Sequence, residues 1–105
     1  MSDPFLYLWA YRVTPETRVE FQDLYGPDGL WVDLFRRAPG YLDTQLLRDR
    51  HDSNRFVTID HWESEEAFLS FRASFAEDFD QLDRLGERLT IEEERLGEFD
   101  RLDAT

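Results

Sequence analysis

The sequence predicts an α+β fold with the element order β-α-β-β-α-β: a four-stranded antiparallel sheet with two helices on one face. Three observations carry this prediction. They are an apolar strand-like run at residues 5–13, two strand-like runs joined by a polar turn at residues 49–54, and a helical stripe of Phe and Leu at residues 68–89. A chain of 105 residues is near the common size of one domain, so we expect a single domain over 1–105 with its core at about 5–100.

The first strand is expected at residues 5–13, because its side chains divide into two largely apolar faces. One face carries Phe5, Tyr7, Trp9, Tyr11 and Val13, and the other carries Leu6, Leu8, Ala10 and Arg12. Such a strand should be covered on both sides. The helices of this chain suffice for one side only, so we expect a second copy to cover the other. Arg12 is expected to pair with an acid, across this dimer in the first instance, or to hold an anionic ligand.

The first helical region is expected to begin at Thr14-Pro15-Glu16, an N-cap hydroxyl followed by proline and an acid. It should break at residues 26–29, where Gly-Pro-Asp-Gly cannot continue a helix, and end at residues 38–40. The inward positions of its two segments are predicted to be Val19, Phe21, Leu24, Tyr25, Leu30, Trp31, Leu34 and Phe35.

The second half of the chain predicts a hairpin, a long helix and a last strand. Strands are expected at residues 41–48 and 55–62, joined by the polar turn between them. Ser64 should cap a helix whose buried stripe is Phe68, Phe71, Phe75, Phe79, Leu82, Leu85 and Leu89. Thr90-x-x-Glu93 has the pattern of a capping box, and the fourth strand is expected at about 94–101.

Composition excludes several classes of function. The net charge of −12 argues against binding to nucleic acid or to anionic membranes, because both repel such a surface. The absence of Cys excludes disulfides, zinc-thiolate sites and thiol catalysis. Two distant His residues predict no metal site. Residues 1–4 have no basic, apolar leader, so we expect a cytoplasmic protein.

The run from Asp60 to Phe68, together with Phe71, resembles the strand-to-helix signature of the antibiotic biosynthesis monooxygenase domain family. Residues 25–31, 35–41 and 89–99 are similar to one acidic branch of that family, so the resemblance covers about residues 5–100. It implies a homodimeric α+β barrel, in which two ferredoxin-like sheets face each other.

The resemblance implies different activities for different members, which include quinol or anthrone monooxygenases and haem degraders. The Asn, Trp and His of the haem degraders correspond here to Tyr11, Phe71 and Gln81, which leaves no axial ligand for haem iron. Members that oxidise polyphenols use a Trp supported by an Asn and a Tyr. The corresponding positions here are Trp62, Thr58 and Phe68.

Oxygenation without a cofactor needs an aromatic slot, a hydrogen-bond donor for a developing oxyanion, and a base. The predicted slot consists of Tyr7, Trp9, Tyr11, Trp31 and Trp62, with Thr58, Phe68 and Phe71 as further contacts. Tyr11 is the predicted donor, and His61 is the predicted base if its face of the sheet is the cavity face. Asp60 points to the opposite face from His61, where it is expected to fix the end of the strand. The alternative is that the rings only fill the core or the dimer interface and that His61 lies in that interface.

The sequence therefore predicts a monooxygenase without metal or flavin, acting on a small aromatic or quinol-like substrate between the sheet and the helices. Two other classes stay open. One is a non-enzymatic dimer that binds a small apolar ligand. The other is a barrel isomerase or lyase that uses His61 as its base.

Overall fold

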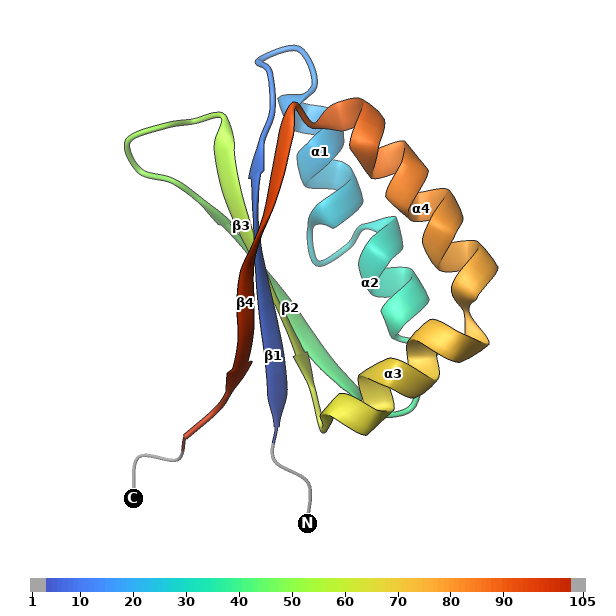
Figure 1. Cartoon of the computed structure of the whole chain (residues 1–105). Helices are drawn as coiled ribbons and strands as arrows, with labels where there is room; N and C mark the ends of the chain where they lie inside the picture. The colour runs from blue at the N-terminus through green and yellow to red at the C-terminus, as the bar shows by residue number, and fades with distance from the viewer. Residues whose placement is uncertain (1–3, 103–105) are drawn as a thin grey trace.

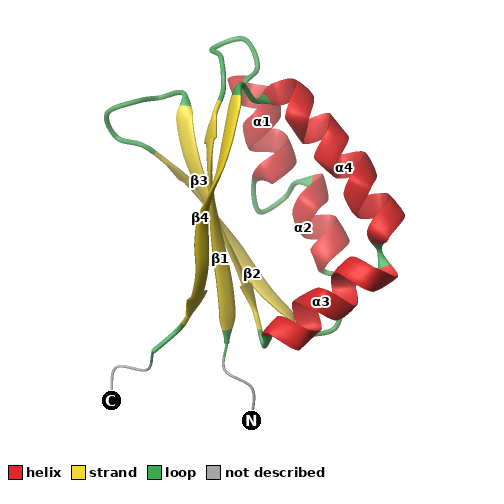
Figure 2. Ribbon diagram, viewed as in Figure 1, coloured by secondary structure: helices red, strands yellow, loops and turns green. Residues whose placement is uncertain are grey.

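The computed structural model describes residues 4–102, which form a four-stranded antiparallel sheet with all of their helices on one face (Figure 1, Figure 2). In chain order its elements are β1 (Phe5–Arg12), α1 (Arg18–Tyr25), α2 (Leu30–Phe35), β2 (Tyr41–Arg48), β3 (Arg55–Trp62), α3 (Glu65–Ser74), α4 (Ala76–Leu89) and β4 (Glu92–Asp100). Residues 1–3 and 103–105, which include both ends of the predicted domain, lie outside this description.

The strand order is β2-β3-β1-β4, and every neighbouring pair is antiparallel, which confirms the predicted ferredoxin-like fold. β2 and β3 have the predicted bounds, β1 ends one residue earlier than predicted, and β4 begins two residues earlier. In the centre of the sheet, Tyr7 pairs with Asp60 and Trp9 pairs with Thr58. The aromatic face of β1 therefore lies beside the polar side chains of β3.

A β-bulge interrupts the pairing of β2 with β3. Tyr41 lies opposite Trp62, but the next pair is Asp43 with His61, so Leu42 is the extra residue. Thr44 then lies opposite Asp60. Because of the bulge, Tyr41 and Thr44 lie on the same face of the sheet although they are three residues apart.

The long helix predicted over the Phe/Leu stripe is divided in the structure. Phe75 has φ −119° and ψ 31°, outside helical geometry, and separates α3 from α4. The two helices run in different directions over the sheet (Figure 1). One straight helix could not follow both directions, so covering the sheet outweighs the local preference for a continuous helix.

Two predicted helix starts are wrong. α1 begins at Arg18 rather than near Thr14, and the Thr17 hydroxyl donates to the carbonyl oxygen of Leu89 at 2.9 Å, which joins the start of α1 to the end of α4. The predicted capping box at residues 90–93 opens no helix. Thr90 ends α4, its hydroxyl donates to the Glu93 carboxylate at 3.1 Å, and the chain continues as β4.

The core is built from aromatic rings, with Phe21 and Trp62 fully buried and Phe56 and Phe71 nearly so. Three side chains predicted to face inward are exposed instead: Val19, Leu30 and Leu85. At the last of these, the buried neighbour Gly86 takes the inward position, facing Tyr25.

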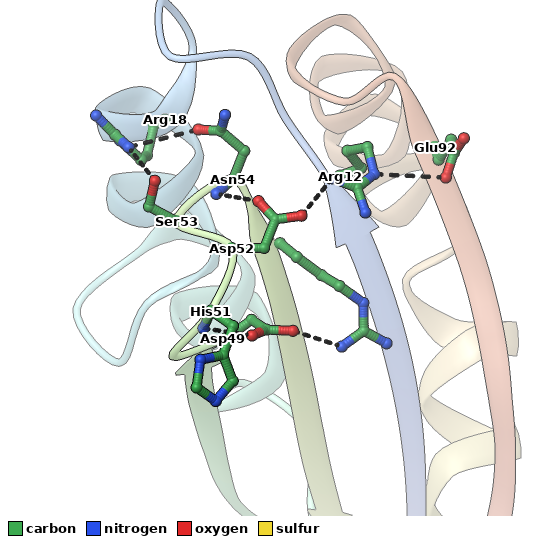
Figure 3. A network of polar contacts seen from close by, with 9 residues as sticks. Arg12, Arg18, Asp49, His51, Asp52, Ser53, Asn54 and Glu92 are labelled. Carbon is green, nitrogen blue, oxygen red and sulfur yellow. Dashed lines mark hydrogen bonds and ion pairs between the residues drawn. The ribbon is translucent and has the colours of Figure 1, made fainter.

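The polar end of the sheet is held by a network of ion pairs and hydrogen bonds (Figure 3). Arg12 pairs with Asp52 of the β2–β3 turn at 2.5 Å and with Glu92 of β4 at 3.8 Å, and Arg18 donates to Ser53 at 3.0 Å. Arg12 thus has acidic partners within its own chain, whereas the sequence had favoured a partner across the dimer.

Within residues 4–102, none of the helices is both long and apolar enough to cross a membrane.

Candidate functional site

A cavity of about 480 Å³ lies between the helices and the face of the sheet that they cover. β1 supplies Tyr7, Trp9 and Tyr11 to its wall, and the helical side supplies Tyr25 and Trp31 among others. The period-two alternation of a strand explains why these three residues of β1 share the cavity. Leu6, Leu8 and Ala10 point to the opposite, open face of the sheet.

The rings of the cavity wall pack closely on one another, so the wall is fixed in shape. The Tyr7 and Phe68 ring centroids are 4.8 Å apart, and those of Tyr11 and Tyr25 are 4.9 Å apart. Tyr25 in turn stacks against Trp31 at 6.1 Å. Aromatic rings in contact favour such offset or tilted arrangements.

The cavity wall contains a buried carboxyl group, that of Asp60. The Thr44 hydroxyl donates to Asp60 Oδ1 at 2.6 Å, and the Tyr41 hydroxyl lies 2.8 Å from Thr44 Oγ1. Burial raises the pKa of Asp60 to about 6, although the hydroxyls of Thr44 and Tyr7 lower it in part by favouring the charged form. A carboxyl with such a pKa can both lose and regain a proton near neutral pH.

The tyrosine hydroxyls of the cavity remain protonated at neutral pH. Burial, followed by the charge of Asp60, raises the pKa of Tyr7 well above its ordinary value. Burial, followed by the proximity of Tyr25, does the same for the pKa of Tyr11, and burial also raises the pKa of Tyr25. These groups are therefore suited to donate hydrogen bonds rather than to accept protons.

Charged side chains from α3, α4 and β4 also line the cavity. The Arg72 guanidinium lies 3.7 Å from the ring centroid of Phe79, in a cation–π contact. Asp83, Glu93 and Arg95 complete this part of the wall. Burial raises the pKa of Glu93. The cavity wall thus carries both signs of charge beside its aromatic rings.

Six of the predicted site residues line the cavity, namely Tyr7, Trp9, Tyr11, Trp31, Thr58 and Phe68. Two others, Trp62 and Phe71, lie behind this wall. Trp62 is fully buried, with its ring centroid 5.1 Å from that of Phe71 and 5.6 Å from that of Phe68. Its indole N–H has no hydrogen-bond partner among the described residues.

His61 does not line the cavity. It pairs with Leu6 in the sheet and so faces the open side, where its Nδ1 lies 3.8 Å from an Asp43 oxygen. Its role as a base was predicted on the condition that its face is the cavity face, and the cavity lies on the other face.

Sequence reasoning placed Asp60 on the face of Thr58 and Trp62 but gave it only a structural role, and it did not single out Thr44. Side chains alternate between the two faces along β3. If the aromatic face of β1 is taken as the cavity face, this alternation is enough to predict that Asp60 lies beside the aromatic slot. Thr44 could not be found in this way, because its position depends on the bulge at Leu42.

Among residues 4–102, no cluster of three or more His, Cys, Asp or Glu side chains could hold a metal ion.

The order of strands, the helices on one face and the cavity between them define a ferredoxin-like α+β domain with an internal aromatic cavity. The profile of the antibiotic biosynthesis monooxygenase family matches residues 4–82. The chain therefore belongs to the antibiotic biosynthesis monooxygenase family.

Solved structures share the fold over nearly the whole chain. The cofactor-independent oxygenase SnoaB from Streptomyces nogalater is 23% identical with a TM-score of 0.81, and the match covers 98% of this chain and 97% of SnoaB. PA3566 from Pseudomonas aeruginosa is 25% identical with a TM-score of 0.68, and 98% of each chain is covered. A conserved protein from Methanosarcina mazei Go1 is 16% identical with a TM-score of 0.71, covering 92% of this chain and 91% of the other. No curated protein sequence matches this chain significantly.

Proposed function

We propose that this domain is a cofactor-independent monooxygenase that oxidises a small aromatic or quinol-like substrate. The observation that carries the proposal is the cavity of about 480 Å³, whose wall is mainly aromatic and contains a few polar groups. Membership of the family and the fold shared with SnoaB, a cofactor-independent oxygenase, support the same reaction class.

In this reaction the substrate supplies the electrons, so the protein needs neither a metal nor a flavin. An electron-rich ring loses a proton and reacts with O2; one oxygen atom enters the product, and the other leaves as water. The rings of Trp9, Trp31 and Phe68, which line the cavity, hold the substrate and exclude water around it. The Tyr11 hydroxyl, which stays protonated because of its burial, donates to the oxyanion that develops on the substrate.

The working unit in this proposal is a homodimer in the cytoplasm, formed through the open face of the sheet. Leu6, Leu8, Val57 and Ile59 lie on that face without a cover from the helices. Leu47 of β2 lies on the same face and is 45% exposed. An apolar sheet face of this kind is stabilised when a second copy of the chain packs on it.

The function is tested by ligand binding and oxygen uptake together. Hydroquinone or a hydroxyanthrone should quench tryptophan fluorescence, because Trp9 and Trp31 line the cavity. Cyclohexanediol, which has a similar size but no aromatic ring, serves as the control and should not quench. With the hydroxyanthrone we expect oxygen consumption, and with isotopically labelled O2 one labelled atom in the product. Failure of the aromatic compounds to bind, or binding without any oxygen incorporation, would overturn the proposal.

A further inference from the structure

We propose that Asp60 is the proton acceptor of this site, and that Thr44 and Tyr41 carry the proton between Asp60 and solvent. The inference rests on the proposed function, because it names the group that makes the substrate anionic. In this proposal Asp60 takes the role of base that the sequence had predicted for His61, because the His61 side chain lies on the other face of the sheet.

The first support is the position of Asp60. Its side chain is part of the cavity wall, beside Tyr7 and Thr58, and is only 7% exposed. An unpaired carboxylate is costly at such a depth. No Lys, Arg or His side chain lies within ion-pair distance of it among the described residues. The carboxylate is therefore stabilised by hydrogen bonds from hydroxyl groups and not by an opposite charge.

The second support is an unbroken chain of hydroxyls that leads from Asp60 toward solvent. Thr44 has one hydroxyl proton and donates it to Asp60, so the Tyr41 hydroxyl must donate to Thr44. Tyr41 is partly exposed, whereas Asp60 is buried. The bulge at Leu42 makes this chain possible, because it places Tyr41 and Thr44 on the same face.

The proton transfer balances without a further reactant. The O–H bond of a substrate phenol breaks, an O–H bond forms on Asp60, and the substrate keeps the electron pair as its phenolate. The Thr44 and Tyr41 hydroxyls then rotate, so that Asp60 donates to Thr44, Thr44 to Tyr41, and Tyr41 to water. One proton then passes along each of these bonds: the Asp60 proton moves to Thr44, the Thr44 proton to Tyr41, and the Tyr41 proton to water. This restores the ionised carboxylate for the next turnover.

The groups around Asp60 determine how it titrates. Tyr7 faces it from β1, and Tyr41, Thr44 and the outward-facing Asp43 belong to β2. From the helices and β4, the charged groups of the cavity are Arg72, Asp83, Glu93 and Arg95. Asp43 raises the pKa of Asp60, as a like charge should, but less strongly than burial does.

A binding experiment tests the position of the carboxylate without turnover. para-Nitrophenol absorbs differently as phenol and as phenolate, so its ionisation can be measured while it is bound. The Asp60 charge should oppose ionisation of the bound phenol. In Asp60→Asn we therefore expect the titration midpoint to fall by about one pH unit or more. Asp43→Asn, which removes a carboxylate from the outer face, is the matched control and should leave the midpoint nearly unchanged. Equal midpoints in wild type and Asp60→Asn would overturn the inference.

A kinetic experiment tests the relay. Oxygen uptake by the wild type should decrease as the pH falls through about 6, where Asp60 becomes protonated. Asp60→Asn should lower uptake roughly 10²-fold and abolish this acid limb. Thr44→Val removes a hydrogen bond to the charged form, so the acid limb should move to higher pH, and Thr44→Ser should restore it. An acid limb that is unchanged in both Asp60→Asn and Thr44→Val would contradict the proposal.

The two proposals fail in different ways. If neither nitrophenol nor hydroxyanthrone binds, the proposed function is wrong and this inference falls with it. If the ligands bind and oxygen is incorporated, but Asp60→Asn has the titration midpoint and pH profile of the wild type, only the role of Asp60 is wrong.

Discussion

The hydroxyl of Tyr25 occupies the space that a Cβ atom on Gly86 would need. Tyr25 also lines the cavity and packs between Tyr11 and Trp31. The absence of a side chain at position 86 therefore allows α4 to approach the cavity wall closely.

This relationship predicts that Gly86→Ala destabilises the protein. Alanine improves helix propensity by about 1 kcal/mol, but displacing the packed Tyr25 ring costs roughly 1–3 kcal/mol. We expect a net loss in the free energy of unfolding, measured by urea denaturation. Tyr25→Phe in the same chain removes the hydroxyl and should recover most of that loss. A Gly86→Ala protein more stable than the wild type would show that Tyr25 moves aside easily.

Asp60→Asn should make the protein more stable at neutral pH, by an amount that depends on pH. The folded-state pKa is about 6, above the ordinary value of 3.8 that we take for the unfolded chain. The folded state therefore binds the proton more tightly, and the stabilisation present below pH 3.8 is lost as the pH rises through about 6. From pH 4 to 7 the stability difference between Asp60→Asn and wild type should grow by roughly 2 kcal/mol. Urea denaturation at several pH values measures it, and a difference that does not change with pH would contradict the raised pKa.

The proposed dimer predicts opposite behaviour for two exposed leucines. Leu47 lies on the open sheet face and is 45% exposed, whereas Leu69 lies on α3 and is 55% exposed. Leu47→Asp would bury a charge in the interface, so it should sediment as a monomer at micromolar concentration. Leu69→Asp adds the same charge elsewhere and should remain dimeric, like the wild type. A monomeric wild type would refute the dimer.

Ser64 is predicted to contribute to stability through its cap on α3. Its hydroxyl oxygen accepts from the backbone N–H of Ala67 at 3.1 Å. Ser64→Ala should lower the free energy of unfolding by roughly 1 kcal/mol, and Ser64→Asp, which keeps an acceptor, should lose less. The exposed Ser74→Ala at the other end of α3 is the control in thermal denaturation. Equal losses in Ser64→Ala and Ser74→Ala would mean that the cap contributes nothing specific.

The strands could be predicted well because their signals are local. The polar turn between β2 and β3 and the Ala-Pro-Gly stop before β2 fix the limits of those strands, and the structure has them at the predicted residues. The break at Phe75 could not be predicted, since no Gly or Pro marks it. It arises from the need to cover a twisted sheet in two directions, which depends on residues far apart in the sequence.

The cavity was predicted less completely than the fold. Both faces of β1 are apolar, so the sequence could not show which face the helices cover. On β3 this led to the prediction of His61 as the base, although Asp60 is the residue on the cavity face. The two residues are adjacent in a strand and therefore point to opposite sides of the sheet. The helical stripe also failed at Leu85, which is exposed, because its neighbour Gly86 takes the inward position against Tyr25.

The single extra residue in β2 has a consequence for how this site could be disabled or acquired. Deleting Leu42 would restore the regular pleat and turn Tyr41 to the opposite side from Thr44, so the path for protons would be cut although no polar group is lost. A change in chain length at one strand end can therefore separate binding of an aromatic compound from its chemistry, without altering any side chain that touches the compound.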